Sequence, residues 1–120
     1  MAVKSYTELL IWKKAIQITK GIYTLVRTLP KEELYGLSDQ MRRSSISIAS
    51  NIAEGQERNT ATEFIRFLSI AQGSRAELET QLIIGKEIGY FREEDINPLM
   101  EQLSELGKMT NSLITTIKNK

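Results

Sequence analysis

Apolar side chains recur along most of the chain at alternating spacings of three and four residues, which places them on one stripe of an α-helix. The pattern predicts four helical segments. The first follows Ser5–Glu8 and ends at Pro30, the second runs from about Ser38 to Gly55, and the third from Thr60 to about Gly89. The fourth begins between residues 93 and 97 and continues to the C-terminus. No segment shows the strict alternation of a β-strand.

The stripes of these segments define an expected core. Its residues are Ile11, Ala15, Ile18, Ile22, Leu25 and Leu29; Leu37, Met41, Ile48 and Ile52; Phe64, Phe67, Leu68, Ile70, Ala71, Leu78, Leu82 and Ile84; and Ile96, Leu99, Leu103, Leu106, Thr110, Leu113 and Ile117. Four helices joined by short breaks predict an all-α fold, an antiparallel up-and-down four-helix bundle. We expect a single domain over residues 1–120, because domains commonly contain about 100–150 residues.

Local signals mark the expected helix ends. Ser5–Glu8 and Thr60–Glu63 both have the spacing of a capping box. Gly55 is expected to end the second helix in a left-handed conformation, and Pro98 fits the first turn of the fourth. The second segment is also rich in small residues that favour close helix packing, namely Ser44, Ser45, Ser47, Ala49, Ser50 and Ala53.

Two absent residue types exclude several kinds of chemistry. The 120 residues include no Cys and no His, so the chain has no thiol nucleophile, no imidazole base and no Cys or His ligand for zinc. The di-iron site of other four-helix bundles needs Glu-x-x-His pairs, and no Gly-rich phosphate-binding loop occurs. We therefore expect no enzyme activity, no metal and no cofactor.

The chain also shows no targeting or membrane signal. Residues 1–8 lack a charged region followed by an apolar run and a cleavage site. No stretch approaches the roughly 18 consecutive apolar residues of a membrane span. We expect a cytoplasmic protein without a membrane partner.

The near-neutral total charge conceals an asymmetry. The formal net charge is +1, but residues 1–53 hold eight basic and four acidic residues, and residues 67–120 hold six basic and eight acidic ones. A basic surface of this kind could contact phosphates, or its arginines could pair with Asp39, Glu54 and Glu57 on the same surface. The candidate nucleic-acid contacts are Lys13, Lys14, Arg42, Arg43, Arg58 and Arg66.

Four aromatic residues have two open interpretations. Tyr6, Trp12, Tyr23 and Tyr35 could stack on bases. Trp12 and Tyr23 flank the apolar stripe of the first helix, and aromatic residues at such an edge also serve in cores and in oligomer interfaces. The sequence leaves the choice open.

The middle of the chain resembles a known family. The run from Gln40 to Gly55, which contains Asn-Ile-Ala-Glu-Gly, resembles the signature of the small four-helix-bundle proteins encoded in intervening sequences of bacterial 23S rRNA genes, often labelled ribosomal-protein-like. Residues 64–71 and 73–82 fit the same family, as do residues 6–15 and 29–33. Arg75 is a departure, because an apolar residue is expected after Gly73-Ser74.

The resemblance implies an antiparallel bundle that assembles into a ring, commonly a homopentamer. It also implies kinship in fold with the accessory proteins of diversity-generating retroelements, which bind nucleic acid and engage a reverse transcriptase. Our leading hypothesis is therefore a non-catalytic, homo-oligomeric protein that binds nucleic acid, most naturally structured RNA. The alternative is a structural module that presents its surface to a protein partner.

Overall fold

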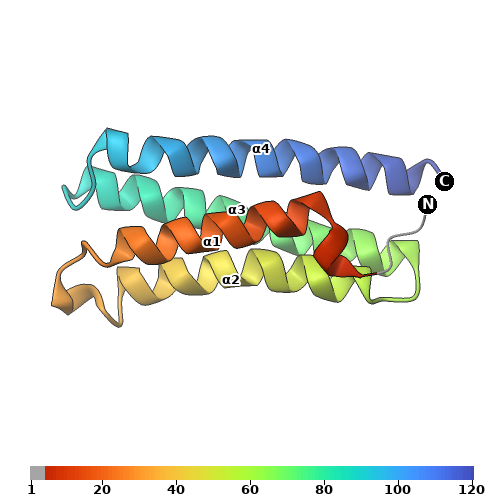
Figure 1. Cartoon of the computed structure of the whole chain (residues 1–120), viewed down its shortest axis with the longest axis horizontal. Helices are drawn as coiled ribbons and strands as arrows, with labels where there is room; N and C mark the ends of the chain where they lie inside the picture. Colours follow the sequence, from red (N-terminus) through yellow and green to blue (C-terminus); the bar gives the residue numbers. More distant parts are fainter. Residues whose placement is uncertain (1–4) are drawn as a thin grey trace.

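Four long helices make up nearly all of the structure, a computed structural model that describes residues 5–120 (Figure 1). They are α1 (Leu10–Val26), α2 (Leu37–Gln56), α3 (Ala61–Glu87) and α4 (Glu93–Lys118). Short 3₁₀ turns precede α1 at Tyr6–Glu8 and α2 at Lys31–Glu33. Residues 1–4, including the Lys4 counted among the basic residues, lie outside the described residues.

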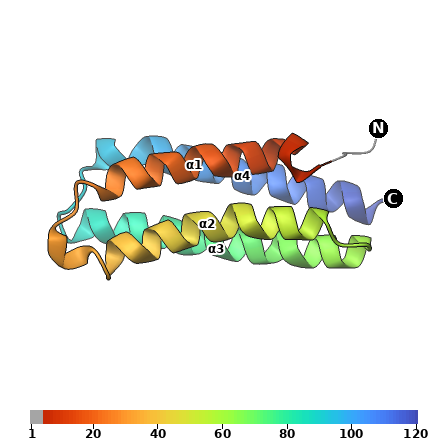
Figure 2. The same ribbon diagram turned by 60° about the horizontal axis from the view of Figure 1, so that its bottom comes forward.

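The helices run alternately up and down along a molecule of 47 × 23 × 19 Å. The α1–α2 and α3–α4 connections lie at one end, and the α2–α3 turn lies at the other, near the start of α1 and the end of α4 (Figures 1 and 2). Each helix packs against two neighbours, and α2 packs most extensively against α3. The predicted antiparallel up-and-down bundle is confirmed.

The core contains most of the predicted stripe residues. Helix bundles bury one face of each helix, and here the most deeply buried large side chains come from all four helices: Ile18, Ile22, Met41, Ile48, Ile52, Leu68, Leu78, Leu82, Leu103 and Leu106. The prediction is wrong for Ile70 and Ile84, which are 41% and 46% exposed. Both lie on the outer face of α3, where isoleucines are exposed among polar residues.

The small residues of α2 allow it to approach α3 closely. Ser47 Oγ and Ser74 Oγ are hydrogen-bonded at 2.8 Å across the two helices. A Cβ atom built on Gly55 would lie 2.8 Å from Phe67 Cβ. Gly55 is helical and does not adopt a positive φ, so the predicted left-handed cap is wrong, and the glycine serves helix packing instead.

Other predicted helix ends also differ in detail. The Ser5 hydroxyl accepts a hydrogen bond from the Thr7 amide and caps the short 3₁₀ turn, so α1 begins only at Leu10. The Thr60 cap of α3 is confirmed, because its Oγ1 accepts from the Glu63 amide at 3.2 Å. Pro98 lies in the second turn of α4, beyond the predicted first turn.

The positive-φ conformation occurs instead at Gly89, with φ of 90°. The Tyr90 amide donates to the Gly85 carbonyl and the Gly89 amide to the Lys86 carbonyl, which is the Schellman pattern at a helix C-terminus. This turn brings Tyr90 to the α1–α2 connection, where its hydroxyl donates to Glu33 Oε2 at 2.8 Å. Glu33 Oε1 accepts from the Leu37 amide at 3.1 Å, so one carboxylate ties together both connections at this end.

Arg75, the departure from the family pattern, lies between α3 and α4. Its Nε donates to Gln72 Oε1 at 2.7 Å, and its Nη1 lies 2.7 Å from Glu79 Oε2. A Cβ atom on Gly107 would lie 2.8 Å from Arg75 Nε. Gly107 therefore makes room for the guanidinium against the backbone of α4.

Candidate nucleic-acid interface

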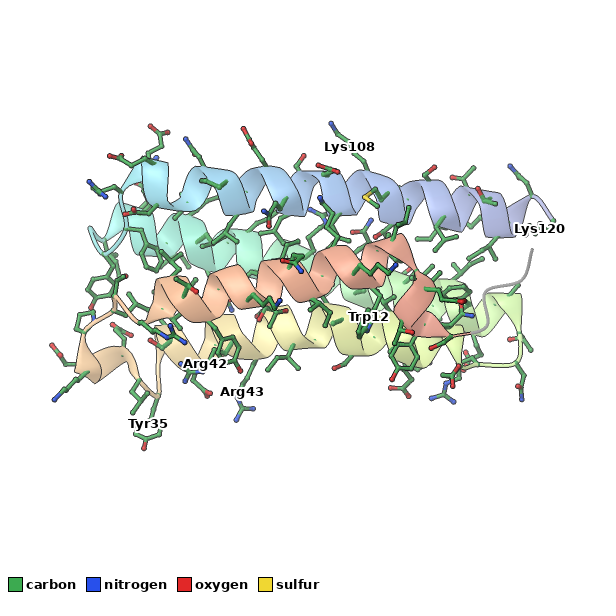
Figure 3. The ribbon with its side chains drawn as sticks, viewed as in Figure 1. Trp12, Tyr35, Arg42, Arg43, Lys108 and Lys120 are labelled. Carbon is green, nitrogen blue, oxygen red and sulfur yellow. The ribbon has the colours of Figure 1, made fainter. Side chains whose placement is uncertain are left out.

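The six predicted contacts lie at three separate places. Arg42 and Arg43 lie near the start of α2, beside the protruding Tyr35 (Figure 3). Arg58 and Arg66 flank the α2–α3 turn at the opposite end, about 20 Å away along the helix axis. Lys13 and Lys14 lie in the first turns of α1. The arginines therefore do not form one continuous cluster.

Most of the predicted contacts are paired with carboxylates. Arg43 Nε lies 3.0 Å from Asp39 Oδ2, and Lys14 Nζ lies 3.1 Å from Glu105 Oε1 on α4. Arg58 pairs with Glu54, and Arg66 pairs with Glu63 at 3.7 Å. These pairs are mostly exposed, and exposed pairs contribute about 0–1 kcal/mol each, so a phosphate can compete for the same guanidinium. The assignment of these residues to nucleic-acid contacts stays a prediction.

Arg58 and Arg66 share a further partner. Their Cζ atoms lie 4.7 and 5.1 Å from the centroid of the Phe67 ring. Both guanidiniums are thus held at the α2–α3 turn by a cation–π contact and an ion pair. This arrangement is compatible with a structural role for both arginines.

A row of cations without ion pairs lies on α1. Lys13, Lys20 and Arg27 are exposed and recur every seven residues, which places them on one stripe of the helix about 10.5 Å apart. Lys31 follows in the α1–α2 connection. Among the described residues, none of these four makes an ion pair within 4.0 Å. We call Lys13, Lys20, Arg27 and Lys31 the α1 cation row.

The sequence contains a signal for this row, although the charge counts over residues 1–53 and 67–120 do not show it. Residues 9–31 include no Asp or Glu, although they include five Lys or Arg. Within residues 5–120, the only acidic residue that forms an ion pair with this stretch is Glu105, which contacts Lys14 from α4. The outer stripe of α1 is therefore positive along its whole length.

Two hollows open along the α1–α2 side of the bundle. One, of about 290 Å³, lies beside Trp12 and Tyr6, whose rings meet edge to face with centroids 5.5 Å apart. The other, of about 610 Å³, lies where α1 passes into α2 and is lined by Tyr23, Arg27 and Arg42, among others. Trp12 and Tyr23 are thus edge residues with one side open. Tyr35 is 89% exposed.

Metal chemistry has no evident site in the part of the chain that the structure describes. Across residues 5–120, no group of three Asp or Glu side chains converges to hold an ion.

The shifted pKa values belong to side chains at the helix connections and at the start of α4. The Arg92 backbone amide, and then the Arg92 guanidinium, lower the pKa of Asp95 at the start of α4.

The four-helix architecture and the α2 signature agree with what comparison shows. The model of the family described as 23S rRNA-intervening sequence protein matches residues 7–112. The chain belongs to this family. A crystal structure of a protein with unknown function from the S23 ribosomal protein family of Bacteroides thetaiotaomicron has a TM-score of 0.81 and 25% sequence identity to it. The similarity covers 88% of this chain and 98% of that one. No curated protein matches the chain.

Membership in the 23S rRNA-intervening sequence protein family does not carry a biochemical activity with it. The solved relative is itself described as having unknown function. No helix within residues 5–120 is long and apolar enough to cross a membrane. The function must therefore be inferred from the surface of the bundle.

Proposed function

We propose that this 23S rRNA-intervening sequence protein is a non-catalytic nucleic-acid-binding protein that acts on structured RNA as a homo-oligomer. The observation that carries the proposal is the α1 cation row. A surface lysine or arginine without a carboxylate partner is free to release counterions from a phosphate backbone, which is the main source of affinity for nucleic acid.

The geometry of the row supports contact with a backbone. Lys13, Lys20 and Arg27 span about 21 Å along one helix stripe, which is long enough to follow several phosphates. Arg42 and Arg43 lie on α2 beside the end of the row, and Arg42 lines the same hollow as Arg27 and Lys31. Phosphate contacts of this kind position an RNA and give little base readout.

The test is a salt series with labelled 23S rRNA fragments. Nucleic-acid binding predicts that log K falls linearly with log salt between about 50 and 200 mM, and each lost phosphate contact reduces the slope by about 0.7–0.9. We expect the triple variant Lys13→Gln/Lys20→Gln/Arg27→Gln to flatten the slope by about 2. Replacing Arg42 and Arg43 with Ala should flatten it further.

A matched control comes from α4. Lys108 points away from the bundle on the α4 side (Figure 3), and both Lys108 and Lys118 are exposed. The double variant Lys108→Gln/Lys118→Gln should leave the slope nearly unchanged. Equal losses in both sets would indicate non-specific charge effects. No binding at about 50 mM salt would favour the alternative, a protein-interaction module.

The homo-oligomeric part of the proposal rests on α3. Four isoleucines of this helix, Ile70, Ile83, Ile84 and Ile88, are each more than 40% exposed. Exposed apolar side chains gathered on one helix are typical of an interaction surface, and a second copy of the chain would cover them. The resemblance makes a pentamer the expected state.

A further inference from the structure

The larger hollow on the α1–α2 side combines an apolar floor with an aromatic wall. Its volume of about 610 Å³ lies within the range of about 300–1,000 Å³ of small-molecule sites. Tyr23 forms one wall and is 39% exposed. The floor consists of aliphatic side chains, namely Val26, Leu29, Pro30 and Leu34.

Three cations rim the hollow with few partners. Arg27 and Lys31 belong to the α1 cation row and make no ion pair among the described residues. The half-buried Arg42 donates from Nη2 to the Leu34 carbonyl at 3.4 Å and lies 3.9 Å from Asp39 Oδ1. Both distances are long for a charged donor, whose bonds to carboxylate or phosphate are commonly about 2.7–2.9 Å. Because a guanidinium has five N–H donors, most of those on Arg42 remain available for an anion.

The hydroxyl of Ser38 provides a second, independent observation. Ser38 lines the hollow and is only 4% exposed. Within residues 5–120 its Oγ has no hydrogen-bond partner. Ser38 Oγ is not among the enclosed, unpartnered polar atoms of the described residues, so it can donate to or accept from a polar atom of a ligand that enters the hollow.

We propose that this hollow binds one unpaired nucleotide of an RNA strand. Its base stacks on Tyr23 over the aliphatic floor, its flanking phosphates contact Arg27, Lys31 and Arg42, and Ser38 Oγ hydrogen-bonds to a polar atom of the base or ribose. The inference rests on the proposed function and specifies that the RNA is single-stranded at this point. Proteins commonly read unpaired RNA by such stacking on aromatic side chains.

The α1 cation row favours a nucleotide over an acidic peptide. A peptide with an apolar side chain next to one carboxylate could fill the hollow, but it would not contact the rest of the α1 cation row. The row continues from Arg27 through Lys20 to Lys13 at intervals of about 10.5 Å, and a polymer with a charge on every unit matches it. An RNA strand that leaves the hollow along α1 would meet these cations with its next phosphates.

The test compares two fluorescein-labelled octamers, one of uridine and one with the same backbone but abasic. We expect Tyr23→Ala to weaken binding of the uridine octamer about fivefold or more and to leave the abasic octamer unchanged. Tyr23→Phe should retain affinity, and Ser38→Ala should weaken binding of the uridine octamer by a few-fold. Tyr35→Ala is the matched control, because Tyr35 is exposed but does not line this hollow.

The outcomes separate this inference from the proposed function. If Tyr23→Ala affects both octamers equally or neither, while the Lys13/Lys20/Arg27 triple variant still weakens binding, the base does not enter the hollow and the proposed function stands. If neither octamer binds at about 50 mM salt but the 23S rRNA fragments do, this inference fails and the proposed function stands; if the fragments do not bind either, both fail. If a peptide of alternating Glu and Phe binds in a Tyr23-dependent manner and the uridine octamer does not, the hollow is a protein-binding site and the inference is overturned.

Discussion

Gly55 and Gly73 are both helical glycines, yet a methyl group would meet different surroundings at each. At Gly55 the added Cβ would lie 2.8 Å from Phe67 Cβ and 3.3 Å from the Phe64 carbonyl oxygen. At Gly73 it would meet nothing within 4 Å. We expect Gly55→Ala to lower the free energy of unfolding by about 1–3 kcal/mol, since α2 and α3 must separate.

Gly73→Ala is the matched control and should raise the free energy of unfolding by about 0.5–1 kcal/mol, because alanine loses less backbone entropy in a helix. Urea unfolding followed by circular dichroism measures both. A neutral Gly55→Ala would show that the two helices can move apart without loss, contrary to the close packing described above.

The same glycine shows where single-residue prediction from sequence fails. A glycine after a helical stripe has the same letter pattern whether it caps the helix or admits a neighbouring side chain. Only the position of Phe67 on α3 decides between these roles for Gly55. The prediction fails at Ile84 for a similar reason, because the three-four spacing does not say which isoleucines of α3 are turned toward the core.

At the scale of elements, Glu33 joins two helix connections through one carboxylate. The hydrogen bond from the Leu37 amide, and secondly that from the Tyr90 hydroxyl, lower the pKa of Glu33. The same contact raises the pKa of Tyr90. A carboxyl whose pKa is lower in the folded state stabilises the fold above its unfolded pKa of about 4.3, and this contribution is lost as the pH falls through the folded pKa.

We therefore expect the free energy of unfolding to decline as the pH falls from about 5 toward 2, with Asp95 contributing in the same direction. Glu33→Gln removes one titrating group and should make the decline shallower. Urea unfolding at several pH values measures this effect. Glu32→Gln is the control, since Glu32 is exposed and makes no hydrogen bond within the described residues. An identical pH profile for Glu33→Gln and wild type would contradict the assignment.

At the level of elements, the sequence predicts the four helices but only part of the candidate interface. The spacing of Asp39 to Arg43 and of Glu54 to Arg58 suggests ion pairs along one helix, and these pairs are present. The hollow at the α1–α2 corner could not be predicted, because it depends on how the chain turns after Val26. In the sequence, Ser38 is a serine at the start of a predicted helix, and only the structure shows that it lines the hollow.

For the whole molecule, the net charge of +1 per chain would not limit the positive field of an assembled ring. In a ring each copy of the chain repeats the α1 cation row, so the local field increases although every copy is nearly neutral. The acidic residues lie mainly toward the C-terminal half, away from this row in sequence. Binding of RNA and self-association are therefore expected to depend on each other, and each needs a separate measurement.

Self-association is tested most directly on the outer face of α3. Ile70, Ile84 and Ile88 recur at multiples of three and four residues and are exposed on one stripe of this helix. We expect light scattering to give the wild-type protein a mass several times 13.7 kDa at micromolar concentration. Ile84→Glu should shift the mass toward that of one chain, because a charge would be buried in the interface without a partner.

Ser104→Glu is the control, since Ser104 is exposed but lies on α4, away from this stripe, and it should leave the mass unchanged. Both side chains are accessible in the single chain, so neither change should affect the helical content. A wild-type mass of one chain would contradict the ring and the increased local field that the ring would produce. It would not contradict the α1 cation row. RNA binding would then have to come from the four cations of one α1 cation row, and the salt slope would be correspondingly small.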